Sequence, residues 1–169
     1  MAKDIKILFG AIALTFVLIL GFAIWQSGRQ PEEVLSNQAI IGLEVTPLSY
    51  ELGNVPINGG IVTKDYEVKN TTDKVLKLKK ITTSCMCTTA SFQVGSKETR
   101  FFGMEMAGDK NPPVNIEVAP GQAGKIQVRF DPAAHGPEGV GPFDRIVWLA
   151  FSDPAGVTEL KFNGTVVSQ

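Results

Sequence analysis

The strongest constraint in this sequence is a run of 19 residues without a charged side chain, Ile7 to Trp25, which reads ILFGAIALTFVLILGFAIW. As a helix at about 1.5 Å per residue it would be roughly 28 Å long, close to the roughly 30 Å hydrocarbon core of a bilayer. Lys3 and Lys6 precede the run, and the positive-inside rule places that side in the cytoplasm. We therefore predict a transmembrane signal-anchor over residues 1–26. It would cross the cytoplasmic (inner) membrane once, contact the lipid bilayer through residues 7–25, and leave the C-terminal domain outside the cytoplasm.

A cleaved secretory signal is the alternative interpretation of the same segment. Such signals have an apolar region of about 7–15 residues and a cleavage site of small residues. The run here is longer, and Ala23-Ile24-Trp25 places a bulky indole where a small residue is expected. Either interpretation exports the rest of the chain. A buried helix of a soluble protein is the remaining interpretation, and it would need a much larger domain around it.

The residues that follow divide into a linker and a domain. Residues 27–40 read SGRQPEEVLSNQAI, a polar composition that predicts a linker, and residues 41–169 remain for one folded domain. Of the 16 basic and 17 acidic residues of the chain, three of each precede residue 41, so the domain keeps the net charge of −1. This balance argues against a nucleic-acid partner and against long-range electrostatic steering toward any partner. The predicted anchor and export favour a protein partner in the cell envelope.

Alternating apolar and polar residues after residue 40 predict strands with one buried face. Val62, Tyr66 and Val68 share one face of such a segment, and Ile146–Phe151 is apolar on both faces, as expected of a central strand. Lys80 falls on the inward side with Leu76 and Leu78, which predicts that its strand ends or bulges there. The fold class that follows is all-β: an immunoglobulin-like sandwich of seven or eight strands, preceded by one N-terminal transmembrane helix. The expected strands cover Leu43–Leu52, 61–69, 75–83, 88–94, 114–118, 125–131, 144–151 and 158–167.

Several short motifs resemble those of a known family. Tyr50–Val55 (YELGNV) resembles the F-x-x-G-x-V opening of Hydin/abnormal-spindle-type immunoglobulin-like domains, and Val68–Thr71 (VKNT) resembles their hydrophobic-x-N-T strand end. Ser84–Thr88 (SCMCT) is similar to the S-C-x-C-T element of bacterial relatives known as domain of unknown function 1573. Residues 119–130 resemble the family's A-P-G turn and following strand. The resemblance implies an exported, often membrane-anchored sandwich of about seven strands, and it implies no established activity.

The sequence departs from that family pattern between the cysteine pair and the A-P-G turn. An extra piece lies around Ser96–Pro113, which reads SKETRFFGMEMAGDKNPP. We predict a surface loop or hairpin here, and such insertions often carry function.

Sulfur and imidazole groups provide the most reactive chemistry of the chain. Cys85 and Cys87 are two residues apart and would face the same side of an extended segment. They could be a buried structural pair, a C-x-C disulfide in an oxidising compartment, or ligands of a soft metal. An intermolecular disulfide or a reactive thiol is a further possibility. Because thiolates and thioethers select Cu(I), the metal hypothesis groups Cys85 and Cys87 with Met104, Met106 and His135, the one histidine of the chain.

The predicted function is that of a non-enzymatic, membrane-anchored, extracytoplasmic module that acts by protein–protein interaction or in envelope assembly, without a cofactor. The alternative is an envelope copper(I)-binding or thiol-redox protein that uses Cys85 and Cys87. A reactive-cysteine enzyme is a third hypothesis, which would need a long-range contact between a cysteine and His135. The loop acid Asp131 is expected only to cap a turn.

Overall fold

The computed structural model describes residues 14–22, 40, 42–153 and 155–168. Residues 14–22 form a helix with exposed side chains. Within the described ranges, no helix has the length and apolarity that crossing a membrane requires. The ends of the predicted span, residues 7–13 and 23–25, and most of the predicted linker lie outside those ranges. The chain divides into two compact units, residues 1–34 and 35–169, and the second contains every described strand.

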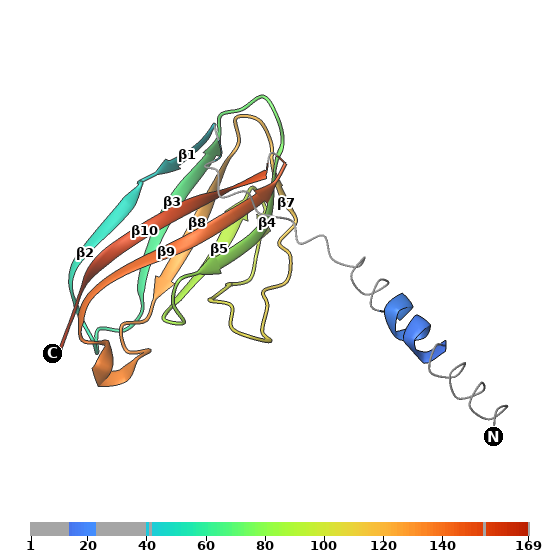
Figure 1. The fold of residues 1–169 in the computed structure, drawn as a ribbon. Coiled ribbons are helices and arrows are strands. Elements are labelled where there is room, and N and C mark those ends of the chain that lie inside the picture. The colour runs from blue at the N-terminus through green and yellow to red at the C-terminus, as the bar shows by residue number, and fades with distance from the viewer. Residues whose placement is uncertain (1–13, 23–39, 41, 154, 169) are drawn as a thin grey trace, which may run out of the picture. The chain divides into compact units, whose positions relative to one another are not determined.

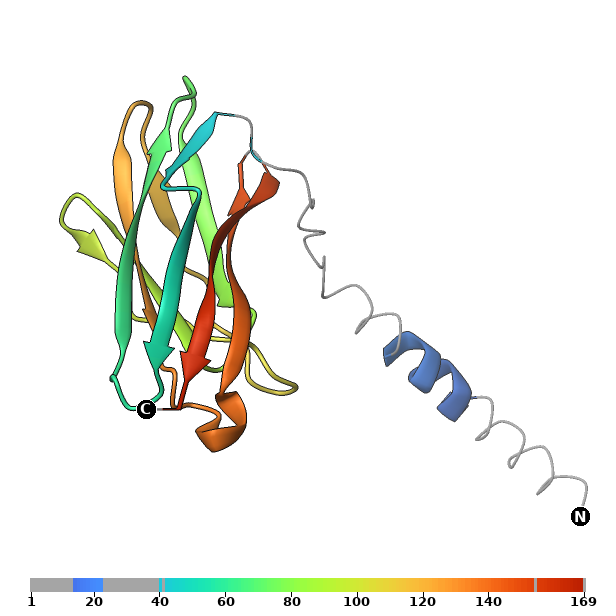
Figure 2. The same cartoon turned by 90° about the vertical axis from the view of Figure 1, so that its left-hand side faces the viewer.

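Ten strands in the described part of the chain form two five-stranded sheets (Figure 1). The first sheet has the order β1 (Leu43–Thr46), β3 (Val62–Asn70), β8 (Ala123–Phe130), β5 (Thr88–Val94), β6 (Lys97–Glu98). The second has the order β2 (Ser49–Pro56), β10 (Ala155–Val167), β9 (Gly141–Ser152), β4 (Leu76–Thr83), β7 (Ile116–Val118). Figure 2 shows the two layers from the side. The prediction of a mostly β, two-layered sandwich is confirmed.

The core lies between the two sheets and follows the period-two pattern of the sequence. Tyr66 and Val68 of β3 have no exposed surface. The buried hydroxyl of Tyr66 donates to the carbonyl oxygen of Lys161 on β10 at 2.6 Å, which ties one sheet to the other. The rings of Phe130 and Phe143, from opposite sheets, stack with centroids 4.5 Å apart. As predicted, β9 is a central strand, paired with β10 on one side and β4 on the other.

The strand predicted over Leu43–Leu52 is in fact two strands in different sheets. β1 pairs antiparallel with β3, whereas β2 pairs parallel with β10. Pro47 lies between them and has no backbone N–H to donate to a ladder, so pairing stops at this residue and the chain passes to the other sheet. The predicted number of seven or eight strands was too low, because this split and the short β6 add to it.

The predicted irregularity at Lys80 is confirmed as a bulge. The register between β4 and β9 shifts between Leu78 and Lys80, and Lys79 and Lys80 are both partly exposed although they are consecutive. The shift turns Lys80 outward, where its ammonium lies 2.6 Å from a carboxylate oxygen of Glu105.

Residues 96–113 are held to the sandwich at several points. After β6, the backbone of Phe102 exchanges two hydrogen bonds of 2.8 Å with Ala90 of β5, and its ring is buried. Glu105 accepts hydrogen bonds from Lys80 and from the backbone N–H of Asn111. Burial acts to raise the pKa of Glu105, but these hydrogen bonds and the nearby lysines outweigh it and lower the pKa. The insertion therefore begins as a short hairpin on the edge of the first sheet and continues as an irregular loop fastened to β4.

Asn70, at the end of β3, ties together segments of both sheets. Its fully buried side chain donates to the carbonyl oxygens of Lys74 at 2.7 Å and Val118 at 2.9 Å. Its amide oxygen accepts from the backbone N–H of Thr72 at 2.9 Å. This network gives the N-T motif of the sequence a structural role, because it shapes the turn from β3 to β4 and holds β7.

We expect Asn70→Ala to lower the free energy of unfolding by about 2–3 kcal/mol, since it removes the side-chain donor from the buried carbonyl oxygen of Val118 and the acceptor that holds Thr72. The measurement is urea unfolding of the purified protein. Asn54→Ala, at an exposed position of β2, is the matched control and should change the free energy by less than about 0.5 kcal/mol. Equal effects of the two substitutions would show that the buried network contributes nothing.

Candidate functional site

The two cysteines lie in the turn that carries the chain from β4 in one sheet to β5 in the other. Cys85 and Cys87 form a disulfide, with an S–S distance of 2.07 Å and Cα atoms 5.2 Å apart. An extended segment would have placed the Cα atoms near the upper limit of about 6.8 Å. The backbone turns instead, so the extended geometry considered from the sequence does not apply. Both cysteines are buried, with 7% and 3% of their surface exposed.

Hydrogen bonds fix this turn from inside and from both neighbouring strands. The buried hydroxyl of Thr83 lies 3.0 Å from the carbonyl oxygens of both Cys85 and Thr88, the two ends of the turn. The Ser84 backbone N–H donates to Ile146 of β9 at 2.9 Å, and the backbone N–H of Ile146 donates to the Ser84 hydroxyl. Because each end is held by a different sheet, the sulfur atoms have a defined position.

His135 reaches the disulfide from the loop that follows β8. Its Nε2 lies 3.1 Å from Sγ of Cys85, although 50 residues separate the two in sequence. The backbone N–H of Asp131, at the start of this loop, donates to the carbonyl oxygen of Cys87 at 2.9 Å. The Asp131 carboxylate accepts from the backbone N–H of Ala133 at 2.9 Å, which confirms its predicted role as a turn cap. The imidazole itself is exposed, and the 3₁₀ turn Gly136–Gly139 follows it (Figure 1).

Arg145 completes the cluster from β9, and its role could not be predicted from the sequence. Its Nε donates to Sγ of Cys87 at 3.3 Å, and its Nη1 donates to the carbonyl oxygen of Asp144 at 2.8 Å. Arg145 stood near the start of a predicted strand, but no spacing rule connects that position with a cysteine 58 residues earlier. A cleft of about 270 Å³, lined in part by His135 and Arg145, opens beside this cluster.

Three of the five proposed copper ligands therefore lie together. The sulfurs of Cys85 and Cys87 and a ring nitrogen of His135 are all within 4.8 Å of one another. Of the two methionines, Met104 is partly buried. The residue before it, Gly103, lies beside the start of β5, because a Cβ atom built on Gly103 would be 3.8 Å from the carbonyl oxygen of Thr88. Met106 is 57% exposed. The contact between a cysteine and His135 that the third hypothesis needs is also present, but here the sulfur belongs to a disulfide.

The chemistry of this cluster depends on its oxidation state. As a disulfide, the pair has hydrogen-bond partners on both sulfurs. Sγ of Cys85 contacts His135 and accepts from the backbone N–H of Cys87 at 3.1 Å. Sγ of Cys87 accepts from Arg145 and lies 3.6 Å from the hydroxyl of Thr88. On reduction the same groups would lie beside two thiols, and a neighbouring cation stabilises a thiolate. The arrangement can therefore support thiol–disulfide exchange or, when reduced, the binding of a soft metal.

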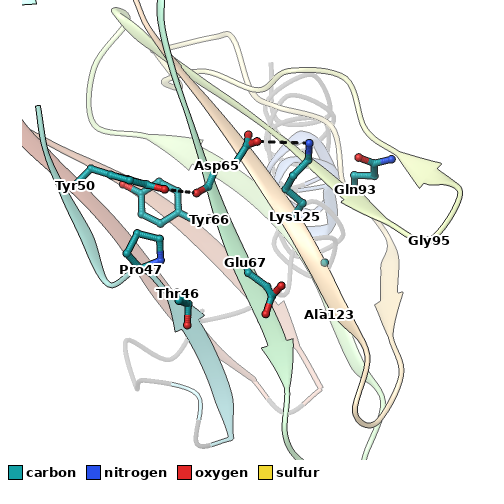
Figure 3. Close-up of a pocket in the computed structure, with 11 residues that line it drawn as sticks. Thr46, Pro47, Tyr50, Asp65, Tyr66, Glu67, Gln93, Gly95, Ala123 and Lys125 are labelled. Atoms are coloured by element: carbon teal, nitrogen blue, oxygen red, sulfur yellow. Dashed lines mark hydrogen bonds and ion pairs between the residues drawn. The ribbon is translucent and has the colours of Figure 1, made fainter.

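A second hollow, of about 500 Å³, lies around Tyr50 and Tyr66 (Figure 3). Several of its polar groups have partners within the chain. The Tyr50 hydroxyl donates to the carbonyl oxygen of Asp65 at 2.7 Å, and the Asp65 carboxylate lies 3.6 Å from the ammonium of Lys125. Figure 3 shows both contacts along the wall of the hollow, which offers no group comparable with the cysteine cluster.

Comparison with known proteins supports the family resemblance. Residues 43–99 match the model of a family described as "Protein of unknown function (DUF1573)", a range that includes the S-C-x-C-T element. This match supports an immunoglobulin-like domain of that kind. No curated protein matches the chain.

Solved structures with a similar fold include a protein of unknown function from Porphyromonas gingivalis W83. It has 18% sequence identity and a TM-score of 0.51, and the alignment covers 73% of this chain and 46% of that one. This chain therefore corresponds to less than half of the Porphyromonas protein, and the likeness concerns the fold alone. The PapD-like domain 7 of human CEP192 aligns at 14% identity and a TM-score of 0.45, covering 76% of this chain and 87% of that one.

The hydroxyl of Thr83 provides a test of how the cysteine turn is held. We expect Thr83→Val to lower the free energy of unfolding by about 1–3 kcal/mol, because the variant keeps the side-chain shape but loses the one hydroxyl proton that the carbonyl oxygens of Cys85 and Thr88 share. Thr89→Val, on the neighbouring strand, is the matched control and should have a much smaller effect. Chemical denaturation of both variants gives the comparison, and equal values would contradict the assigned role of Thr83.

Proposed function

We propose that this chain is a single-pass, membrane-anchored immunoglobulin-like module that faces the outside of the cytoplasmic membrane and acts by contact with a protein partner in the envelope. The anchor is supported by the charge-free run from Ile7 to Trp25 and by the lysines before it. The exported position is further supported by the Cys85–Cys87 disulfide, since such bonds persist in oxidising compartments. The near-neutral domain favours recognition by shape over long-range electrostatic attraction.

The anchor is tested by membrane fractionation of cells that express the full chain. We expect the protein in the membrane pellet after carbonate extraction, with the domain accessible to protease from the outer side. Val17→Lys places a charge near the middle of the run, at a cost of about 2.5–3.5 kcal/mol for insertion, and should release part of the protein or prevent its export. Val17→Ile is the matched control and should behave as the wild type. A mature protein that begins after residue 25 would contradict the anchor and establish a cleaved signal.

A second candidate function, thiol–disulfide exchange with the partner, is favoured by the contacts of His135 and Arg145 with the two sulfurs. Cys85 is the less buried of the two cysteines, so a partner thiolate would attack its Sγ. A bond forms between the partner and Cys85, the Cys85–Cys87 bond breaks, and the electron pair leaves on Cys87 beside the guanidinium of Arg145. The partner's second thiolate then displaces Cys85, which takes up a proton, and the partner's dithiol becomes a disulfide.

This exchange predicts a specific role for the guanidinium group. Arg145→Gln should slow reduction of the disulfide by a protein dithiol by roughly tenfold, because the departing thiolate of Cys87 loses a charged hydrogen-bond donor. The rate is measured by trapping and counting free thiols over time. Arg129→Gln, an arginine whose guanidinium lies 3.8 Å from the ring centre of Phe101, is the control and should leave the rate unchanged. Equal rates for Arg145→Gln and wild type would remove Arg145 from the mechanism.

A further inference from the structure

We propose that the reduced form of this domain binds one Cu(I) ion through the sulfurs of Cys85 and Cys87 and Nε2 of His135. The inference develops the thiol–disulfide function above. It adds a metal ion as a ligand of that site, which binds only when the two cysteines are reduced. The cluster of three ligand atoms from two distant segments is the observation that carries it.

The ligand set suits a soft, monovalent ion. Thiolates favour soft and borderline metals, of which Cu(I) and Zn²⁺ are single ions, and imidazole is a ligand of both. A structural zinc site almost always has four protein ligands, whereas the cluster found among the His, Cys, Asp and Glu residues of the described chain has three. No carboxylate belongs to this cluster, so hard cations such as Mg²⁺ and Ca²⁺ lack the oxygen ligands they prefer.

The geometry needs only a local change to accept the ion. Bonds of roughly 2.0–2.3 Å, the lengths that zinc makes with nitrogen and sulfur, would separate three ligand atoms around a trigonal ion by about 3.5–4 Å. The His135–Cys85 contact of 3.1 Å is already near that separation. The two sulfurs must move apart from their bonded distance, and the Cα separation of 5.2 Å leaves room for this by side-chain rotation.

The fold should survive reduction, which the site requires. The disulfide closes a ring of three residues, and a ring this short restricts the unfolded chain by only about 1–2 kcal/mol. The turn is also held by Thr83, Ser84 and the backbone of Asp131, whose hydrogen bonds do not involve the S–S bond. Loss of the bond therefore leaves the ligand residues near their present positions.

Access and charge favour the same conclusion. His135 is exposed, so an ion can reach the buried sulfurs from the solvent side of the cluster. The reduction consumes two electrons and two protons, which a dithiol supplies as it becomes a disulfide. Binding of Cu(I) then releases the two thiol protons. The resulting Cu(I)–dithiolate centre carries one negative charge, and the guanidinium of Arg145 lies beside it to balance that charge.

The test uses the full chain in detergent micelles without oxygen, reduced by a phosphine so that it does not depend on exchange with a dithiol. Cu(I) is titrated in competition with a chromogenic chelator, and thiols are counted in parallel. We expect uptake of one Cu(I) per chain with a thiolate-to-copper absorption band. The Cys85→Ser/Cys87→Ser variant should take up none, and His135→Asn should bind at least tenfold more weakly.

Met106→Leu is the matched control and should bind as the wild type, because the proposed centre does not include this exposed side chain. Circular dichroism of each variant verifies that it is folded. Absence of uptake by reduced, folded wild type would overturn the copper site, as would equal uptake by the double serine variant or equal affinity for Zn²⁺. A disulfide that a protein dithiol cannot reduce, combined with copper uptake after phosphine treatment, would overturn the exchange function while leaving the copper site intact.

Discussion

The crossing of the chain from one sheet to the other between Thr83 and Thr88 is the constraint on which the site depends. β4 pairs with β9 in one sheet, and β5 pairs with β8 in the other. The turn that joins β4 to β5 therefore lies where the start of β9 and the end of β8 come close together. Arg145 arrives on the first of these strands and His135 just beyond the second. The position of both groups beside the cysteines follows from strand pairing in the two sheets.

In this arrangement hydrogen bonds hold the backbone around the cluster, whereas the side chains of the cluster can still change their positions. Backbone hydrogen bonds hold the turn at Ser84 and at Cys87, and the Thr83 hydroxyl bridges its interior. None of these contacts uses the bond between the sulfurs. A change of oxidation state can therefore alter the chemistry of the site without rebuilding the sandwich, as a redox-dependent binding site requires.

The sequence was informative where local pattern determines structure and uninformative where long-range pairing does. Alternation located the buried faces of β3 and β8, the continuous apolar run identified β9 as a central strand, and the position of Lys80 predicted a bulge. Each of these signals depends on neighbours within one strand. The segment Leu43–Leu52 divides because its first half pairs with β3 in one sheet and its second half with β10 in the other. The alternation within a single strand does not show with which strand it pairs. In the same way, Cys85 and Cys87 were evident as a pair, and His135 was considered because it is unique. The contact of Arg145 with Cys87 has no local signal at all.

The short disulfide is better explained by chemistry than by stability. A bridge between the sheets of a sandwich closes a long loop and restricts the unfolded chain strongly, whereas a bridge that closes a very short loop is expected to stabilise the fold only weakly. Cys85 and Cys87 are two residues apart in a turn that hydrogen bonds already define. A pair of small apolar residues would fill the same buried space without a reactive bond. Arg145 would then keep its hydrogen bond to the carbonyl oxygen of Asp144, but its contact with Cys87 and that of His135 with Cys85 would be lost. Both contacts have a use in the exchange and copper binding that we propose, because these reactions take place at the sulfur atoms.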